Sequence, residues 1–147
     1  MIRRHFLHGA VACAAMSLLA SACSFTDVPS IADDPGMLLS EGGFTAPDLD
    51  MQIVDSPLQD ADRWDPIITF SGPTLKVEDW VEENFPGGID SRAEGDDLQV
   101  VVARLGEGVQ KKGDRVATGA HEPIAYVVVV GQEEEPTVHV AMRGPVR

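Results

Sequence analysis

The sequence predicts an α+β fold, in which a small antiparallel sheet of about four to five strands has one amphipathic helix packed on it and is preceded by a disordered acidic tether. Three observations lead to this prediction. One stretch repeats apolar residues at helical spacing, several later stretches are rich in β-branched residues, and the first part of the chain is strongly acidic. A helix followed by a run of strands is typical of an α+β chain rather than of alternating βαβ units.

The tether is predicted over residues 23–62. This stretch holds four prolines and three glycines and shows no sustained helix or strand period. Its apolar residues are frequent for a pure spacer, so residues 51–54 are a candidate edge strand that docks on the domain. The folded α+β domain is then expected over residues 63–147, with no disulfide to stabilise it.

The helix is predicted to begin near Thr74, which could cap it, and to end at the Pro-Gly-Gly sequence of residues 86–88. Acidic residues take the outward side, so the helix should lie on the sheet. Trp80 is therefore interpreted as a core residue and not as part of a ligand site. Four apolar residues follow i, i+3, i+4, i+8 spacing and share the inward face: Val77, Trp80, Val81 and Phe85.

The strands are predicted from branched and aromatic runs, and Pro66 within the first run favours an edge or a strand start over a sheet centre. In the last run, Val138, Val140 and Met142 should alternate inward. The connections at residues 106–114 and 132–136 are expected to be exposed, and the first lacks the Gly-Lys-Ser/Thr of a phosphate-binding loop. The predicted strand runs are residues 64–70, 98–105, 115–118, 124–130 and 137–142.

The N-terminus has the three regions of a secretory signal peptide, predicted over residues 1–22. Arg3 and Arg4 form a positive end, an apolar run covers residues 9–22, and residues 20–22 are small. At about 1.5 Å per residue this run reaches roughly 21 Å, which is short of a hydrocarbon core of roughly 30 Å. A cleaved signal is thus favoured over a membrane-spanning anchor.

The end of this signal resembles the lipobox of bacterial lipoproteins, with the sequence Leu-Ala-Ser-Ala-Cys at residues 19–23. Ala20 stands where that family usually has leucine. The resemblance implies that Cys23 is lipidated with acyl chains such as palmitate and becomes the new N-terminus. Cys13, the only other cysteine, lies inside the removed signal, so no free thiol would remain. The alternative is an ordinary signal peptide cut nearby, with Cys23 incidental.

The start also resembles a twin-arginine (Tat) export signal, because Arg3, Arg4, Phe6 and Leu7 match its arginine pair, Phe and Leu, and the apolar run is only mildly hydrophobic. This resemblance implies that the domain folds before it crosses the membrane. The alternative is the Sec route, whose signals often carry two adjacent arginines. Either route predicts a cell-membrane protein that faces away from the cytoplasm and is held there by lipid.

Charge restricts the partners. Residues 24–97 carry eighteen acidic and three basic residues, a balance of −15, whereas residues 98–147 carry six of each. Such a field disfavours nucleic acid and anionic headgroups, and could attract cations or a basic protein. The expected partners are the membrane, through the N-terminal lipid, and a protein of the cell envelope. Acidic segments that merely stay solvated are the simpler interpretation of the charge.

Few residues suggest chemistry, and neither a catalytic residue nor a cofactor is predicted. The sequence lacks HExxH, GxSxG and calcium-loop motifs, and residues 90–97 have Arg92 where a ligand oxygen would be needed. His121, Glu122 and His139 are the only candidates for a metal or acid–base site. They would act only if the fold brought the two imidazoles together in a pocket.

Three functions follow from these observations. The favoured one is a noncatalytic binding or interaction module of the cell envelope, held by lipid at Cys23. The second is a small extracytoplasmic hydrolase or metal-dependent enzyme built on His121, Glu122 and His139. The third is an immunity or exclusion lipoprotein, which has the same anchor and acidity as the first.

Overall fold

The computed structural model describes residues 33–55, 65–90 and 96–144. In these ranges the chain forms three helices and one open antiparallel sheet of five strands. This confirms the predicted α+β class and the number of strands, but the sequence predicts only one of the three helices. No helix in the described ranges is long and apolar enough to cross a membrane. The elements follow the order α1 (Pro35–Glu41), β1 (Met51–Val54), β2 (Ile67–Ser71), α2 (Thr74–Asn84), α3 (Asp96–Leu105), β3 (Arg115–His121), β4 (Ile124–Val130) and β5 (Thr137–Arg143).

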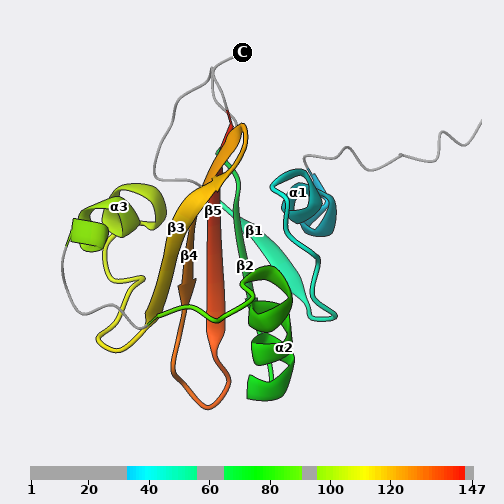
Figure 1. Cartoon of the computed structure of the whole chain (residues 1–147), viewed down its shortest axis with the longest axis vertical. Coiled ribbons are helices and arrows are strands. Elements are labelled where there is room, and N and C mark those ends of the chain that lie inside the picture. Colours follow the sequence, from blue (N-terminus) through cyan, green and yellow to red (C-terminus); the bar gives the residue numbers. More distant parts are fainter. Residues whose placement is uncertain (1–32, 56–64, 91–95, 145–147) are drawn as a thin grey trace, which may run out of the picture.

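The sheet has the strand order β1-β2-β5-β4-β3, so that β1 and β3 are its two edges (Figure 1). All four neighbouring pairs are antiparallel. β4 coincides with its predicted run, and β2, β3 and β5 agree with theirs to within a few residues. The candidate edge strand at residues 51–54 is confirmed as β1, which pairs Met51 with Phe70.

The strand predicted over residues 98–105 is wrong, because these residues belong to the helix α3. Three consecutive valines favour a strand locally, and this preference misled the prediction. Val101 and Leu105, one helical turn apart, are both buried against the sheet, while Val100 is 41% exposed. Burial of one helical face therefore overrides the local preference. Gly106, with φ of +97°, follows the last turn.

Both faces of the sheet are covered. We call the face under α1 and α2 the first face and the face under α3 the second face; Figure 1 shows α3 on the side away from the other two helices. The first face has the larger core, rich in aromatic rings, and Val138, Val140 and Met142 point into it as predicted. Trp80 is central there, and its ring centroid lies 5.1 Å from that of Phe70.

The tether prediction fails for residues 33–55, which are part of the folded domain. Leu38 and Leu39 on α1 and Phe44 after it are buried in the first-face core, and the Phe44 ring lies 6.0 Å from that of Trp80. The Trp80 indole N–H also donates to the Thr45 carbonyl over 2.8 Å. Prolines and glycines here mark tight packing rather than a spacer, so the domain begins well before residue 63.

The end of α1 explains why glycines are needed at this point. A Cβ on Gly42 would lie 2.0 Å from the sulfur of Met142, and Gly43 has φ of +83° beside the His121 ring. At Gly43 only glycine combines a positive φ with so close an approach, because a Cβ there would lie 2.6 Å from the His121 ring. At the other end of α1, the Asp34 carboxylate caps the helix by accepting from the backbone N–H groups of Gly36 and Met37.

α2 begins and is held in place differently from the prediction. Thr74 is its first residue and does not cap it; the Thr74 hydroxyl instead donates to the Glu134 carbonyl in the β4–β5 connection. Glu78 accepts two hydrogen bonds from the Arg115 guanidinium on β3. These contacts fix the helix across the first face, with Val77, Trp80 and Val81 buried as the spacing predicts.

Candidate functional site

The three residues proposed for a metal or acid–base site do not form one. His121 and His139 lie on β3 and β5, which flank β4, and their side chains point to opposite faces of the sheet. Glu122 is exposed in the turn that follows β3. Within the described ranges, no group of three His, Cys, Asp or Glu side chains is arranged to hold a metal ion. The residues proposed for the enzyme are therefore separated by the sheet itself.

His121 has a structural role. Its ring lies 4.8 Å from the Phe44 ring and 4.9 Å from the Tyr126 ring, and its Nδ1 is 2.8 Å from the Gly42 carbonyl oxygen. The donor in that hydrogen bond is the imidazole N–H, because a carbonyl oxygen can only accept. His121 thus connects the end of α1 to the end of β3, which is the edge strand opposite β1.

His139 lines a polar hollow on the second face, which we call the polar pocket and which has a volume of about 300 Å³. Two loops that are far apart in sequence meet there. Residues 106–114, before β3, bring Lys111 and the buried Asp114, and the β4–β5 connection brings Glu133. Val109 and Val129 supply apolar wall. The pocket is therefore amphipathic and built from three separate parts of the chain.

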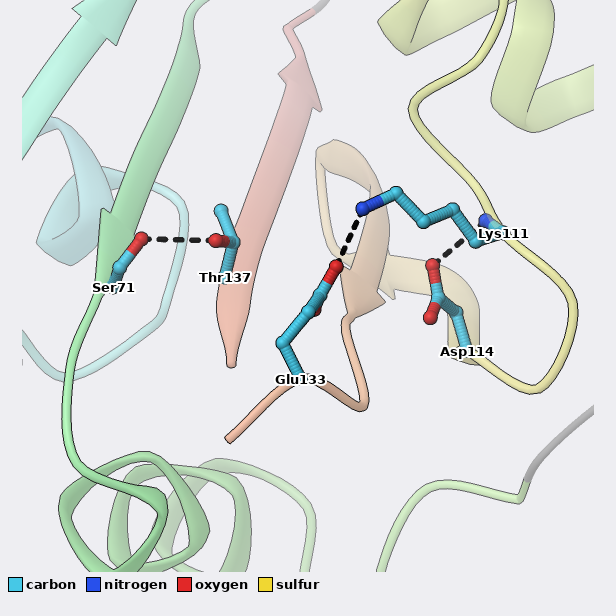
Figure 2. A network of polar contacts seen from close by, with 5 residues as sticks. All are labelled: Ser71, Lys111, Asp114, Glu133 and Thr137. Carbon is cyan, nitrogen blue, oxygen red and sulfur yellow. Dashed lines mark hydrogen bonds and ion pairs between the residues drawn. The ribbon is translucent and has the colours of Figure 1, made fainter. Parts of the chain in front are cut away.

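Hydrogen bonds and one ion pair order the rim of the polar pocket (Figure 2). The Lys111 ammonium lies 2.5 Å from the Glu133 carboxylate, and the Asp114 carboxylate accepts from the Lys111 backbone N–H over 2.8 Å. The hydroxyls of Thr137 and Ser71 are 3.0 Å apart, which ties β5 to β2 beside the pocket. The pocket is thus held by its own side chains on both sides.

Electrostatics set the charge states in the polar pocket. Its hydrogen bond to Glu133 raises the pKa of Lys111, and the same bond lowers the pKa of Glu133, so this pair stays ionised. Burial lowers the pKa of His139, although the negative charges of Asp114 and Glu133 oppose that shift. His139 is therefore a neutral imidazole at neutral pH, with Nδ1 3.1 Å from the Thr69 hydroxyl.

The polar pocket was missed by the sequence prediction for a definable reason. Residues 106–114 and 132–136 are each predicted to be exposed loops, and separately each has that composition. Only the antiparallel pairing of β4 with both β3 and β5 brings them to the same end of the sheet. The pocket presents hydrogen-bonding groups and an ion pair beside an apolar wall.

Comparison with known proteins adds no assignment: no family model matches the chain, and neither the curated proteins nor the solved structures give a match. The signal and lipidation residues predicted from the sequence, Arg3, Arg4, Phe6, Leu7 and Cys23, lie outside the described residues.

Proposed function

We propose that this protein is a bacterial lipoprotein of the cell envelope, anchored by acyl chains on Cys23, whose domain acts as a noncatalytic binding module. The Leu-Ala-Ser-Ala-Cys sequence of residues 19–23 carries the proposal, because it ends the signal-like segment in a single cysteine. Several acyl chains, at about 0.8 kcal/mol per buried methylene, hold a protein firmly where one chain does not.

The early start of the domain supports a position close to the membrane. Nine residues lie between Cys23 and Asp33, the first described residue, so the two are ten peptide steps apart. Even a fully extended chain of that length spans at most about 35 Å. A flexible chain with the roughly fourfold greater length of the predicted tether would have about twice the root-mean-square span. The proposed anchor would therefore hold the module nearer to the bilayer than that prediction implied.

The placement of the histidines favours binding over catalysis. The enzyme hypothesis needs His121 and His139 in one pocket, and they face opposite sides of the sheet. His121 is occupied by packing and by its hydrogen bond to Gly42. The polar pocket and the sheet edges remain available for noncovalent contacts.

Cell fractionation of matched cysteine variants tests the anchor. Cys23→Ser should move the protein from the membrane fraction to the soluble fraction while leaving the domain folded. Cys13→Ser is the control, because Cys13 lies inside the predicted signal and its loss should leave the mature protein on the membrane. Retention of Cys23→Ser on membranes would contradict the proposal.

The export route is tested separately. Replacement of both Arg3 and Arg4 by lysine should stop export if the Tat machinery is used, because this route depends on the arginine pair. Accessibility of the domain to protease added outside the cytoplasmic membrane reports export. Unchanged accessibility in the double variant would assign the protein to the Sec route and leave the lipid anchor intact.

A further inference from the structure

β1 is an open edge of the sheet. β2 pairs with one of its sides, and no strand pairs with the other among the described residues. Figure 1 shows β1 at the end of the sheet nearest α1. The outer side of an edge strand presents unpaired backbone N–H and C=O groups, which can pair with an extended segment of another chain.

Apolar side chains are exposed around this edge. In the described ranges five large apolar side chains are exposed, and three of them belong to α1 and β1: Met37 is 45% exposed, Ile53 42% and Val54 44%. Ile53 and Val54 are neighbours in a strand, so their side chains point to opposite faces. A strand added here would therefore find an apolar contact on each of its faces.

A hollow of about 550 Å³ lies beside this edge and is lined by Asp34, Gly36, Met37, Ser40, Glu41 and Ala46. It lies next to the start of β1, because a Cβ on Gly36 would be 3.5 Å from both the Ala46 side chain and the tip of Met51. The hollow gives a bound segment room for side chains beyond the backbone pairing.

The charge around the edge selects the partner. Residues 33–55 contain six acidic residues and no basic one. Glu41, Asp50 and Asp55 are exposed and form no ion pair among the described residues, whereas Asp48 pairs with Lys76. A second copy of this chain would bring like charges together, and the net charge of −15 over residues 24–147 adds to that repulsion. A cationic partner is therefore favoured over self-association.

We propose that the outer edge of β1 binds an extended basic segment of another envelope protein, which adds a strand to the sheet and alternates apolar with cationic side chains. The location in the envelope rests on the proposed function. Backbone pairing supplies the binding geometry, Ile53 and Val54 supply apolar contacts, and Asp50 and Asp55 select for positive charge.

The opposite edge provides an internal comparison. β3 is longer than β1, but its exposed residues are Thr118, Gly119 and Ala120, which offer little apolar surface and no charge. The proposal therefore predicts that a basic strand selects β1 over β3, although both edges present backbone groups.

The test uses the full mature protein purified from whole cells, whichever fraction holds it, and three synthetic peptides as probes. One alternates lysine with valine, the second alternates glutamate with valine, and the third alternates lysine with proline. The third has the same charge as the first but lacks half of the backbone N–H groups that strand pairing needs. Binding is measured by calorimetry, and hydrogen exchange maps the amides that become protected.

The lysine–valine peptide should protect the amides of residues 51–54, and the other two peptides should bind at least about tenfold more weakly. Asp50→Lys combined with Asp55→Lys should weaken its binding about tenfold or more. The matched control, Glu82→Lys with Glu83→Lys on the exposed side of α2, should change binding less than about threefold. Circular dichroism verifies that both double variants fold.

Four results would overturn the proposal. They are equal binding of the lysine–proline peptide, protection confined to β3, absence of binding by the lysine–valine peptide, and a dimer formed through β1. None of these results bears on the proposed lipid anchor, because membrane association is measured separately by fractionation. Failure of the lipid anchor would in turn show in fractionation without altering peptide binding.

Discussion

The two faces of the sheet are built differently. The first face is covered by α1 and α2, and its core contains Phe44, Phe70 and Trp80 among fourteen buried residues. Of the helices in the described ranges, α3 alone covers the second face, together with Val109 of the following loop, and the core there consists of seven smaller aliphatic residues. The second face also carries the polar pocket with His139.

This difference suggests that the first face mainly stabilises the domain, whereas the second face has room for a binding pocket. Burial of aromatic side chains contributes most to the stability of a small domain without disulfides, so the first face should dominate its free energy of unfolding. Residues 38–44 supply part of the core of that face. We therefore expect the segment that contains α1 to be required for the stability of the domain. The thinner second face leaves room for polar groups that a dense core would exclude.

Trp80→Ala should give the largest loss of stability, about 3–5 kcal/mol. It removes the ring at the centre of the first-face core and the hydrogen bond to Thr45. Urea unfolding followed by circular dichroism measures the effect. Trp80→Phe, which keeps a ring but loses the N–H donor, should cost clearly less; equal losses would argue against aromatic packing as the main contribution.

Leu39→Ala should destabilise the domain by about 2–5 kcal/mol, because the side chain is fully buried in the first-face core. Met37→Ala, on the exposed side of the same helix, is the matched control and should change the unfolding free energy by less than about 0.5 kcal/mol. If neither variant changes the unfolding free energy, residues 33–55 are not part of the folded core and the tether prediction is correct.

Val101→Ala tests the second face and should cost about 1–3 kcal/mol, less than either first-face variant. Val101 is fully buried between α3 and the sheet. Ala103→Ser, on the exposed side of α3, serves as control in the same urea titration. A loss larger than that of Trp80→Ala would reverse the ranking of the two faces.

The smallest effect is a pH dependence from His139. Burial lowers its pKa in the folded state below the ordinary value of 6.5, so the unfolded state binds more protons at mildly acidic pH. The stabilising contribution is complete above about pH 6.5 and is lost as the pH falls through the lower folded pKa. His139→Gln should flatten this decline in urea midpoints between about pH 7.5 and pH 5.5. An unchanged slope would contradict the pKa shift.

Elements with a clear period were predictable from the sequence. The spacing of Val77, Trp80 and Val81 defines α2, and the branched runs define β4 and β5. The α3 region was assigned incorrectly because valine favours strands locally, and only burial of Val101 and Leu105 reveals the helical period. Residues 33–55 were misassigned because glycines and prolines signal a linker and close packing equally well.

The candidate sites were less predictable than the fold. Lys111 and Glu133 are twenty-two positions apart in the sequence and form an ion pair only in the folded protein. No local sequence motif predicts such a contact. His121 and His139 looked equivalent in the sequence, yet strand alternation sends them to opposite faces. If β5 paired with β4 one residue out of its present register, His139 would point to the same face of the sheet as His121.

Mass spectrometry of the intact protein extracted from membranes tests the proposed lipoprotein identity most directly. The account predicts a mature chain that begins at Cys23 and carries covalent acyl chains, with residues 1–22 removed. A mature N-terminus at any other residue, or an unmodified Cys23 thiol on the membrane-bound protein, would contradict it.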